Sequence, residues 1–205
     1  MKPNTRGYEE SMAPNVYHDQ SFKLDAAKIM PGEYYVTQRS MLLVTTLGSC
    51  VSACIRDKTN GIGGMNHFML PDSKQGSGWG ATSTRYGTYA MEILINQLLQ
   101  LGAKRSNLEA KLFGGGAVIK NMTATNVGER NVAFGQHYLQ TEGIPIVAKD
   151  LLDIYPRKIY FFPSTGKVLV KKLLNMHNTT ILVRETEYRS RLVQSKVEGD
   201  IELFT

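Results

Sequence analysis

The sequence contains only two cysteines, Cys50 and Cys54, among its 205 residues. Two cysteines cannot provide the disulfide framework of a small secreted domain. Residues four apart on an extended strand have Cα atoms roughly 13 Å apart, too far for a disulfide. No second pair of cysteines or histidines follows at the spacing of metal ligands. We therefore expect two free thiols and no metal site.

Long apolar runs are also missing. No stretch approaches the roughly 20 apolar residues that a membrane-spanning helix needs. The first residues include Lys2 but no apolar segment behind it, so no secretory signal is expected. These features predict a cytoplasmic protein that does not insert into a membrane.

Basic residues exceed acidic residues, 24 against 18, and the formal net charge is +6. The Lys and Arg residues are scattered along the chain, and aromatic residues do not alternate with them. This pattern does not predict a nucleic-acid partner. It is compatible with a partner protein that carries acidic side chains.

Hydrophobic periodicity predicts one α/β domain in which two principal helices pack against mixed β-sheet. Helical spacing covers residues 84–101 and 127–143. The expected strands have β-rich composition or turn residues at their ends, and they cover residues 33–37, 41–46, 51–56, 62–70, 108–113, 144–149, 157–162 and 167–173.

The ends of the chain lack a clear pattern. We expect a flexible N-terminal extension over residues 1–22, the domain over 23–183, and a C-terminal tail over 184–205. The tail sequence fits a helix, a strand or a partly ordered segment equally well. The glycine-rich segment 73–83 around Trp79 is interpreted either as a lid beside a site or as an ordinary connection.

The strongest candidate for chemistry is Cys50, which follows the small residues Gly48 and Ser49 between two apolar runs. His67 lies seventeen residues further on, in the next apolar run. If these runs pair as neighbouring strands, the thiol and the imidazole meet at a solvent-open edge and form a cysteine nucleophile with its own base. Backbone N–H groups of Gly48 and Ser49 would then offer an oxyanion hole. The simpler alternative is two buried residues in adjacent strands, as we expect for Cys54.

A triple glycine, residues 114–116, follows the strand predicted at 108–113. A phosphate-binding loop would require a following Gly-Lys-Ser/Thr or a G-x-G-x-x-G spacing, and neither is present. The glycines instead indicate a tight turn or a close approach of this backbone to another segment.

Several ordered blocks of the sequence resemble the CheD family, the chemoreceptor glutamine deamidases of bacterial chemotaxis. The blocks are LGSCV at 47–51, GGMNHFMLP at 63–71, KLFGG at 111–115, NVGERN at 126–131 and RKIYFFPSTG at 157–166. The resemblance implies a protein-glutamine deamidase without a cofactor. It also implies a fold similar to that of bacterial toxin deamidases, a single-domain layered α/β sandwich of mixed β-sheet. It also implies two partners, the cytoplasmic helices of methyl-accepting chemotaxis receptors and a CheC-type phosphatase.

The resemblance further implies that Cys50 is the nucleophile, His67 the general acid and base, and an upstream threonine the third catalytic residue. Both Thr45 and Thr46 are available, and we favour Thr45. Adjacent strand residues face opposite ways, so at most one of the two points at the site. Two rival functions stay open: a cysteine amidase for small amides or peptide bonds, and a regulatory module that binds receptors or the phosphatase with little catalysis.

Overall fold

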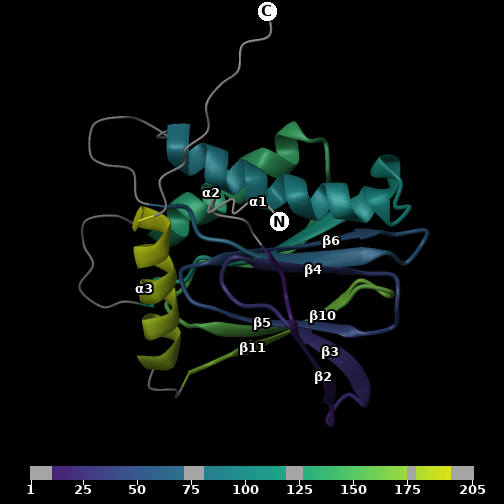
Figure 1. Cartoon of the computed structure of the whole chain (residues 1–205), viewed down its shortest axis with the longest axis horizontal. Coiled ribbons are helices and arrows are strands. Elements are labelled where there is room, and N and C mark those ends of the chain that lie inside the picture. The colour runs from purple at the N-terminus through teal and green to yellow at the C-terminus, as the bar shows by residue number, and fades with distance from the viewer. Residues whose placement is uncertain (1–10, 72–80, 119–126, 175–178, 195–205) are drawn as a thin grey trace, which may run out of the picture.

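The structure is a computed structural model that describes residues 11–71, 81–118, 127–174 and 179–194. It has three layers, in which two helices cover one β-sheet and that sheet packs on a second sheet (Figure 1). The α/β sandwich predicted from the sequence is thereby confirmed, although its strands form two mixed sheets.

The first sheet has six strands. In spatial order they are β1 (Ser11–Met12), β4 (Glu33–Thr37), β7 (Gly63–His67), β6 (Val51–Asp57), β8 (Leu108–Gly114) and β9 (Ile146–Leu151). The two outermost pairs, β1 with β4 and β8 with β9, are parallel, and the inner pairs are antiparallel.

The second sheet has five strands. In spatial order they are β11 (Lys167–Lys172), β10 (Arg157–Phe162), β5 (Leu42–Leu47), β3 (Leu24–Lys28) and β2 (Asn15–Asp19). Only β3 and β5 run parallel within it.

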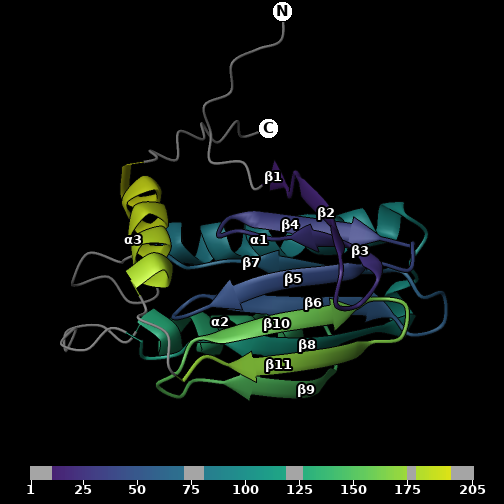
Figure 2. The same ribbon diagram turned by 90° about the horizontal axis from the view of Figure 1, so that it is seen from below.

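Three α-helices complete the described part of the chain. Helices α1 (Ala81–Gln100) and α2 (Val127–Thr141) cover the outer face of the first sheet. A short 3-10 turn, η1 (Arg105–Asn107), precedes β8. Helix α3 (Thr179–Gln194) stands beside one end of the two sheets (Figures 1 and 2).

Two apolar cores hold the layers together. The core between helices and first sheet includes Leu94, Leu98, Phe134 and Leu139. The core between the two sheets includes Leu43, Leu47, Cys54, Met65 and Phe161. Burial of each such side chain contributes about 1.5–3 kcal/mol, so the facing of the two sheets is fixed mainly by the second core.

The chain passes from the second sheet to the first within three residues. Strand β5 ends at Leu47 and β6 begins at Val51, so Gly48, Ser49 and Cys50 form the crossing. Strands β6 and β7 pair antiparallel, as predicted, and an isolated bridge between Val51 and Phe68 extends this pairing toward the crossing. The crossing therefore lies beside the end of β7 that carries His67.

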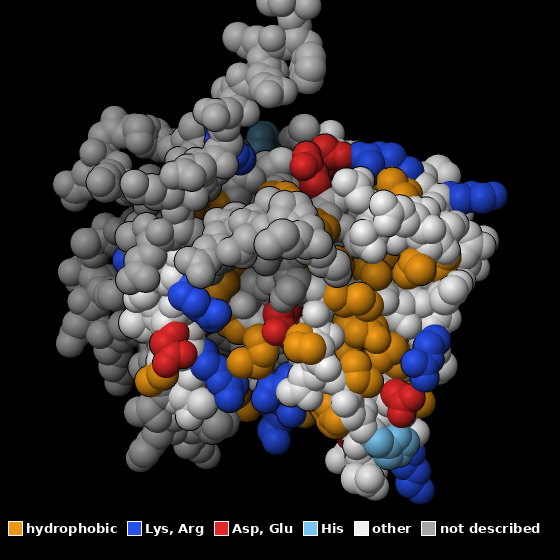
Figure 3. Space-filling view, in the orientation of Figure 1, with side chains coloured by type: hydrophobic (Ala, Val, Ile, Leu, Met, Phe, Trp, Pro, Cys, Tyr) orange, Lys and Arg blue, Asp and Glu red, His pale blue; other side chains and the backbone are white. Residues whose placement is uncertain are grey.

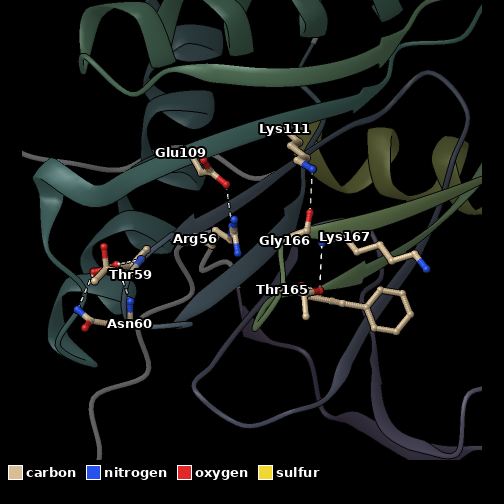
Figure 4. A network of polar contacts seen from close by, with 10 residues as sticks. Arg56, Thr59, Asn60, Glu109, Lys111, Thr165, Gly166 and Lys167 are labelled. Atoms are coloured by element: carbon tan, nitrogen blue, oxygen red, sulfur yellow. Dashed lines mark hydrogen bonds and ion pairs between the residues drawn. The ribbon is translucent and has the colours of Figure 1, made fainter.

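The opposite end of β6 is fixed by polar contacts. Arg56 Nε donates to Glu109 Oε1 at 2.7 Å, and Lys111 Nζ donates to the Gly166 carbonyl at 2.8 Å (Figure 4). Asp57 is fully buried and accepts the N–H groups of its own turn. The Lys111 contact joins the first sheet to the turn between β10 and β11, whereas the Arg56 and Asp57 contacts lie within the first sheet and its own turn.

The predictions for the two ends of the chain need correction. Residues 11–19 of the expected flexible extension form β1 and β2, and α3 spans the boundary predicted at residues 183 and 184. Strand β2 escaped notice because it is a mostly exposed edge strand with a weak apolar pattern. Most of the candidate lid, 73–83, lies outside the described residues.

The described helices include none that is both long enough and apolar enough to cross a lipid bilayer.

Candidate active site

The backbone of the triple glycine, residues 114–116, binds two carbonyl groups of the crossing at residues 48–50. Gly115 N donates to the Cys50 carbonyl at 2.8 Å, and Gly116 N donates to the Gly48 carbonyl at 2.7 Å. At Gly114, where φ is +111°, an added Cβ would lie 2.2 Å from the Cys50 carbonyl oxygen. The close backbone approach predicted from these glycines is confirmed.

Asn131 of α2 binds the remaining carbonyl of the crossing. Its Nδ2 donates to the Ser49 carbonyl at 2.9 Å, and its Oδ1 accepts the Leu70 N–H at 2.8 Å. The side chain therefore ties the crossing to the segment that follows β7. Because all three carbonyls of the crossing are bound, their peptide groups are fixed in orientation.

Thr45 of β5 orients the imidazole of His67 across the interface of the two sheets. Thr45 Oγ1 donates to the Ile29 carbonyl at 2.7 Å and lies 2.8 Å from His67 Nδ1. The single hydroxyl proton is used by Ile29, so Nδ1 must carry the proton that Thr45 accepts. This tautomer leaves Nε2 unprotonated, and Nε2 makes no hydrogen bond to any described residue.

The structure brings Cys50 and His67 together, as the sequence predicts. Cys50 Sγ, a ring nitrogen of His67 and a carboxylate oxygen of Glu185 all lie within 4.8 Å of one another. Thr45 makes the contact with His67, whereas Thr46 is half-buried and lines a neighbouring hollow. The catalytic roles of these side chains stay predictions.

The expectation of a solvent-open site is wrong for this arrangement. Cys50 is 0% exposed and His67 is 1% exposed, because α3 lies over the crossing and inserts Glu185, itself 3% exposed. Cys54 is also buried, within the core between the sheets, as expected.

Glu185 binds every N–H group of the crossing. Its Oε1 accepts from Gly48 N at 2.9 Å and from Cys50 N at 3.2 Å. Its Oε2 accepts from Ser49 N at 3.0 Å and from Ser49 Oγ at 2.7 Å. The backbone N–H groups predicted to form an oxyanion hole thus converge on one place, and a carboxylate occupies it.

The closed site disfavours charge on both reacting groups. Burial raises the pKa of the Cys50 thiol, and the negative charge of Glu185 raises it further. Burial lowers the pKa of His67 to about 4, although the same carboxylate opposes this shift. At neutral pH the pair is therefore a neutral thiol beside a neutral imidazole.

A hollow of about 670 Å³ adjoins the site between α3 and the second sheet. Thr45, Thr46, His67 and Glu185 contribute to its lining.

Comparison with known proteins assigns the family. Residues 69–172 match a family model described as CheD chemotactic sensory transduction. A Methylobacillus flagellatus protein named probable chemoreceptor glutamine deamidase CheD is 60% identical over 96% of this chain and 98% of its own length. A Herminiimonas arsenicoxydans protein with the same name is 61% identical over the same shares. The chain belongs to the CheD family.

Some solved structures resemble this CheD-family chain distantly. The hypothetical protein YfiH of Bacillus licheniformis gives a TM-score of 0.38 at 12% identity, over 73% of this chain and 64% of that chain. Similarity at this level carries no argument about function.

Sequence reasoning about this CheD-family chain missed Glu185. A signal existed, because Ile181, Tyr188 and Leu192 have the spacing of one helix face and Glu185 falls within that stripe. A carboxylate in an otherwise apolar stripe is expensive to bury unless it meets donors. Asn131 was missed as well, although it ends one of the blocks that resemble the family.

Cys50, His67 and Glu185 also carry donor types that bind metal ions, with their donor atoms within 4.8 Å. Both oxygens of Glu185 already accept hydrogen bonds from N–H or O–H groups. The geometry of this CheD-family site therefore fits a hydrogen-bonded carboxylate.

Proposed function

We propose that this chain is a protein-glutamine deamidase that converts glutamine side chains of methyl-accepting chemotaxis receptors to glutamate and ammonia. The observation that carries the proposal is the convergence of Cys50, His67 and three backbone N–H groups on one point. The relatives' name, chemoreceptor glutamine deamidase, supports the same reaction.

The first step is attack by Cys50 on the side-chain amide. His67 Nε2 takes the thiol proton, and a bond forms between Sγ and the amide carbon. The oxyanion hole predicted from the sequence uses the N–H groups of Gly48 and Ser49. We assign the stabilisation of the negative oxygen of the tetrahedral intermediate instead to Gly48 and Cys50, because these two N–H groups point at one acceptor position. The Ser49 N–H points at the other oxygen of Glu185.

Collapse of the intermediate breaks the carbon–nitrogen bond. His67 returns its proton to the leaving nitrogen, and ammonia departs from a thioester on Cys50. A water molecule then gives a proton to His67 and attacks the thioester carbon. The carbon–sulfur bond breaks to release glutamate, and His67 returns the proton to the sulfur, which restores the thiol. Thr45 acts by holding the Nδ1 proton, so that Nε2 faces the chemistry.

The proposed partners are the cytoplasmic helices of the receptors, and the proposed location of the protein is accordingly the cytoplasm. The family resemblance adds a CheC-type phosphatase as a second proposed partner. Binding assays between the purified proteins test each partner separately.

The decisive experiment compares two cysteine variants on a receptor cytoplasmic fragment, with glutamine-to-glutamate conversion followed by mass spectrometry. We expect conversion by the wild type and by Cys54→Ala, and none by Cys50→Ala. Conversion by Cys50→Ala at the wild-type rate would refute the nucleophile. Full chemotactic function of Cys50→Ala in cells would favour the regulatory binding module instead.

A further inference from the structure

Glu185 occupies the place that the proposed reaction assigns to the substrate. Its Oε1 receives the N–H groups of Gly48 and Cys50, the pair assigned to the substrate oxygen. Its side chain is a carboxylate within 4.8 Å of the Cys50 sulfur, which is the chemical form of the deamidated product. Helix α3 thus presents to the site what a receptor helix would present after turnover.

The hydrogen-bond donors around the Glu185 side chain fit a carboxylate better than an amide. Four donor contacts reach the two oxygens, including the N–H and hydroxyl of Ser49 at Oε2. An amide has one acceptor oxygen, and its NH₂ group would face the Ser49 N–H. The carboxylate therefore satisfies the crossing more completely, as expected of an inhibitor that resembles product.

Helix α3 reaches the site with one face. The buried side chains of this face are Ile181, Glu185, Tyr188 and Leu192. Tyr188 contacts Tyr86 through the two hydroxyl groups and packs where Gly32 leaves room. Glu187 lies on the exposed side of the helix. An α-helix is therefore a shape that this end of the sheets accepts.

The charge around the hollow favours a different helix from α3. Three lysines of the second sheet, Lys28, Lys158 and Lys171, line it. Lys and Arg side chains gather beside the lower part of α3 on this face (Figure 3). Helix α3 itself has three arginines against two glutamates. An acidic helix would complement this surface better, because like charges at close range oppose binding.

We propose that α3 is an internal product mimic that closes the active site, and that an acidic helix carrying the substrate glutamine displaces it. The inference rests on the proposed deamidase function. It predicts that α3 holds the resting enzyme inactive. It also predicts that the receptor opens the site when its glutamine side chain replaces Glu185 at the N–H groups of the crossing.

The geometry also explains how closure affects reactivity. Glu185 withholds the N–H groups of the crossing, and its charge raises the pKa of the Cys50 thiol. Departure of α3 frees these donors, admits water and removes a negative charge from beside the sulfur. All three changes favour the thiolate.

The first test turns α3 into a substrate. Glu185→Gln places an amide at this position, so Cys50 should attack it and form a thioester with release of ammonia. A water molecule that enters the space left by the ammonia should then hydrolyse the thioester to the acid and restore the thiol. Mass spectrometry of the C-terminal peptide should find glutamate at this position in Glu185→Gln and retained amide in Glu185→Gln combined with Cys50→Ala. The matched control Glu187→Gln, on the exposed side, should keep its amide.

The second test measures closure on the full-length chain. Glu185→Ala should raise both the rate of Cys50 alkylation by iodoacetamide and kcat/KM for an acidic helical glutamine peptide, each on the order of tenfold, because a closed resting state lowers the reactive fraction. Glu187→Ala should leave both rates unchanged. Circular dichroism and thermal unfolding verify that both variants are folded.

Two different results separate the two proposals. If the receptor fragment is converted in a Cys50-dependent way, while Glu185→Gln keeps its amide and Glu185→Ala gives no rate increase, the inference about α3 is overturned. If neither the receptor fragment nor the introduced amide is converted by any variant, the deamidase function itself fails.

Discussion

Two buried carboxylates lie at opposite ends of β6 and differ in where their donors come from. Asp57 accepts N–H groups from Thr59 at 2.8 Å and Asn60 at 2.9 Å, both within its own turn, and from Lys104 at 2.8 Å. Glu185 accepts from the crossing, 135 or more residues away in the sequence. One carboxylate completes a turn, whereas the other connects two remote segments.

The comparison separates stability from function. Burial opposes the charge of Asp57, but the N–H groups outweigh it and lower the pKa of Asp57 to about 2. Its contacts are permanent parts of the framework. The donors bound by Glu185 are the ones that the proposed reaction assigns to the substrate, so under this proposal the contact must break before turnover. We therefore expect changes at the crossing to affect rate and changes at the turn to affect folding.

The largest effect on rate is expected at His67. His67→Gln keeps most of the side-chain volume but removes the base, so deamidation should fall by about 10²- to 10⁴-fold. The measurement is kcat/KM on a receptor fragment with the folded fraction determined in parallel. If the rate falls only in proportion to the folded fraction, the expectation that His67 affects the reaction and not folding is contradicted.

A smaller effect is expected at Thr45, which touches the base but not the substrate. Thr45→Val removes both hydrogen bonds of the hydroxyl, to the Ile29 carbonyl and to His67 Nδ1. Loss of the contact with His67 should reduce kcat about tenfold, equivalent to about 1.4 kcal/mol. Thr45→Ser keeps the hydroxyl and should restore most of the rate. Equal rates for the two variants would show that the hydroxyl does not orient His67.

At the other end of β6, the expected effect is on folding alone. Asp57→Asn should lower the free energy of unfolding by about 2 kcal/mol, because it weakens charge-assisted bonds from buried N–H groups. Since the pKa of Asp57 is lowered in the folded state, its contribution is complete above about pH 4 and is lost as the pH falls toward about 2. Urea unfolding at several pH values measures this difference.

The activity of folded Asp57→Asn should equal that of the wild type, which serves as the control for this prediction. A stability difference between wild type and variant that stays constant from pH 7 to pH 2 would show that ionised Asp57 is not the stabilising group.

The sequence predicted those features that depend on local residue patterns and on the motif blocks. The pairing of β6 with β7 and the meeting of Cys50 with His67 follow from the two neighbouring apolar runs and the small residues that precede Cys50. The choice between Thr45 and Thr46 needed coordinates, because alternation says that only one faces inward without saying which one.

The rest could not be predicted, for a physical reason. The contact of Glu185 with the crossing depends on where α3 packs, and no local pattern encodes a contact across 135 residues. The edge strand β2 was missed because its side chains are mostly exposed, and exposure removes the apolar periodicity that identifies a strand.

The absence of a side chain at Gly48 has an evolutionary consequence. An added Cβ there would lie 2.8 Å from Glu185 Oε1, and the substrate oxygen is proposed to use the same position. A mutation at Gly48 that expelled the resident helix would therefore exclude the receptor as well. If α3 closes the site as proposed, a permanently active enzyme arises by changes in α3. Gly48 itself stays constrained, because both Glu185 and the substrate glutamine need the space beside it.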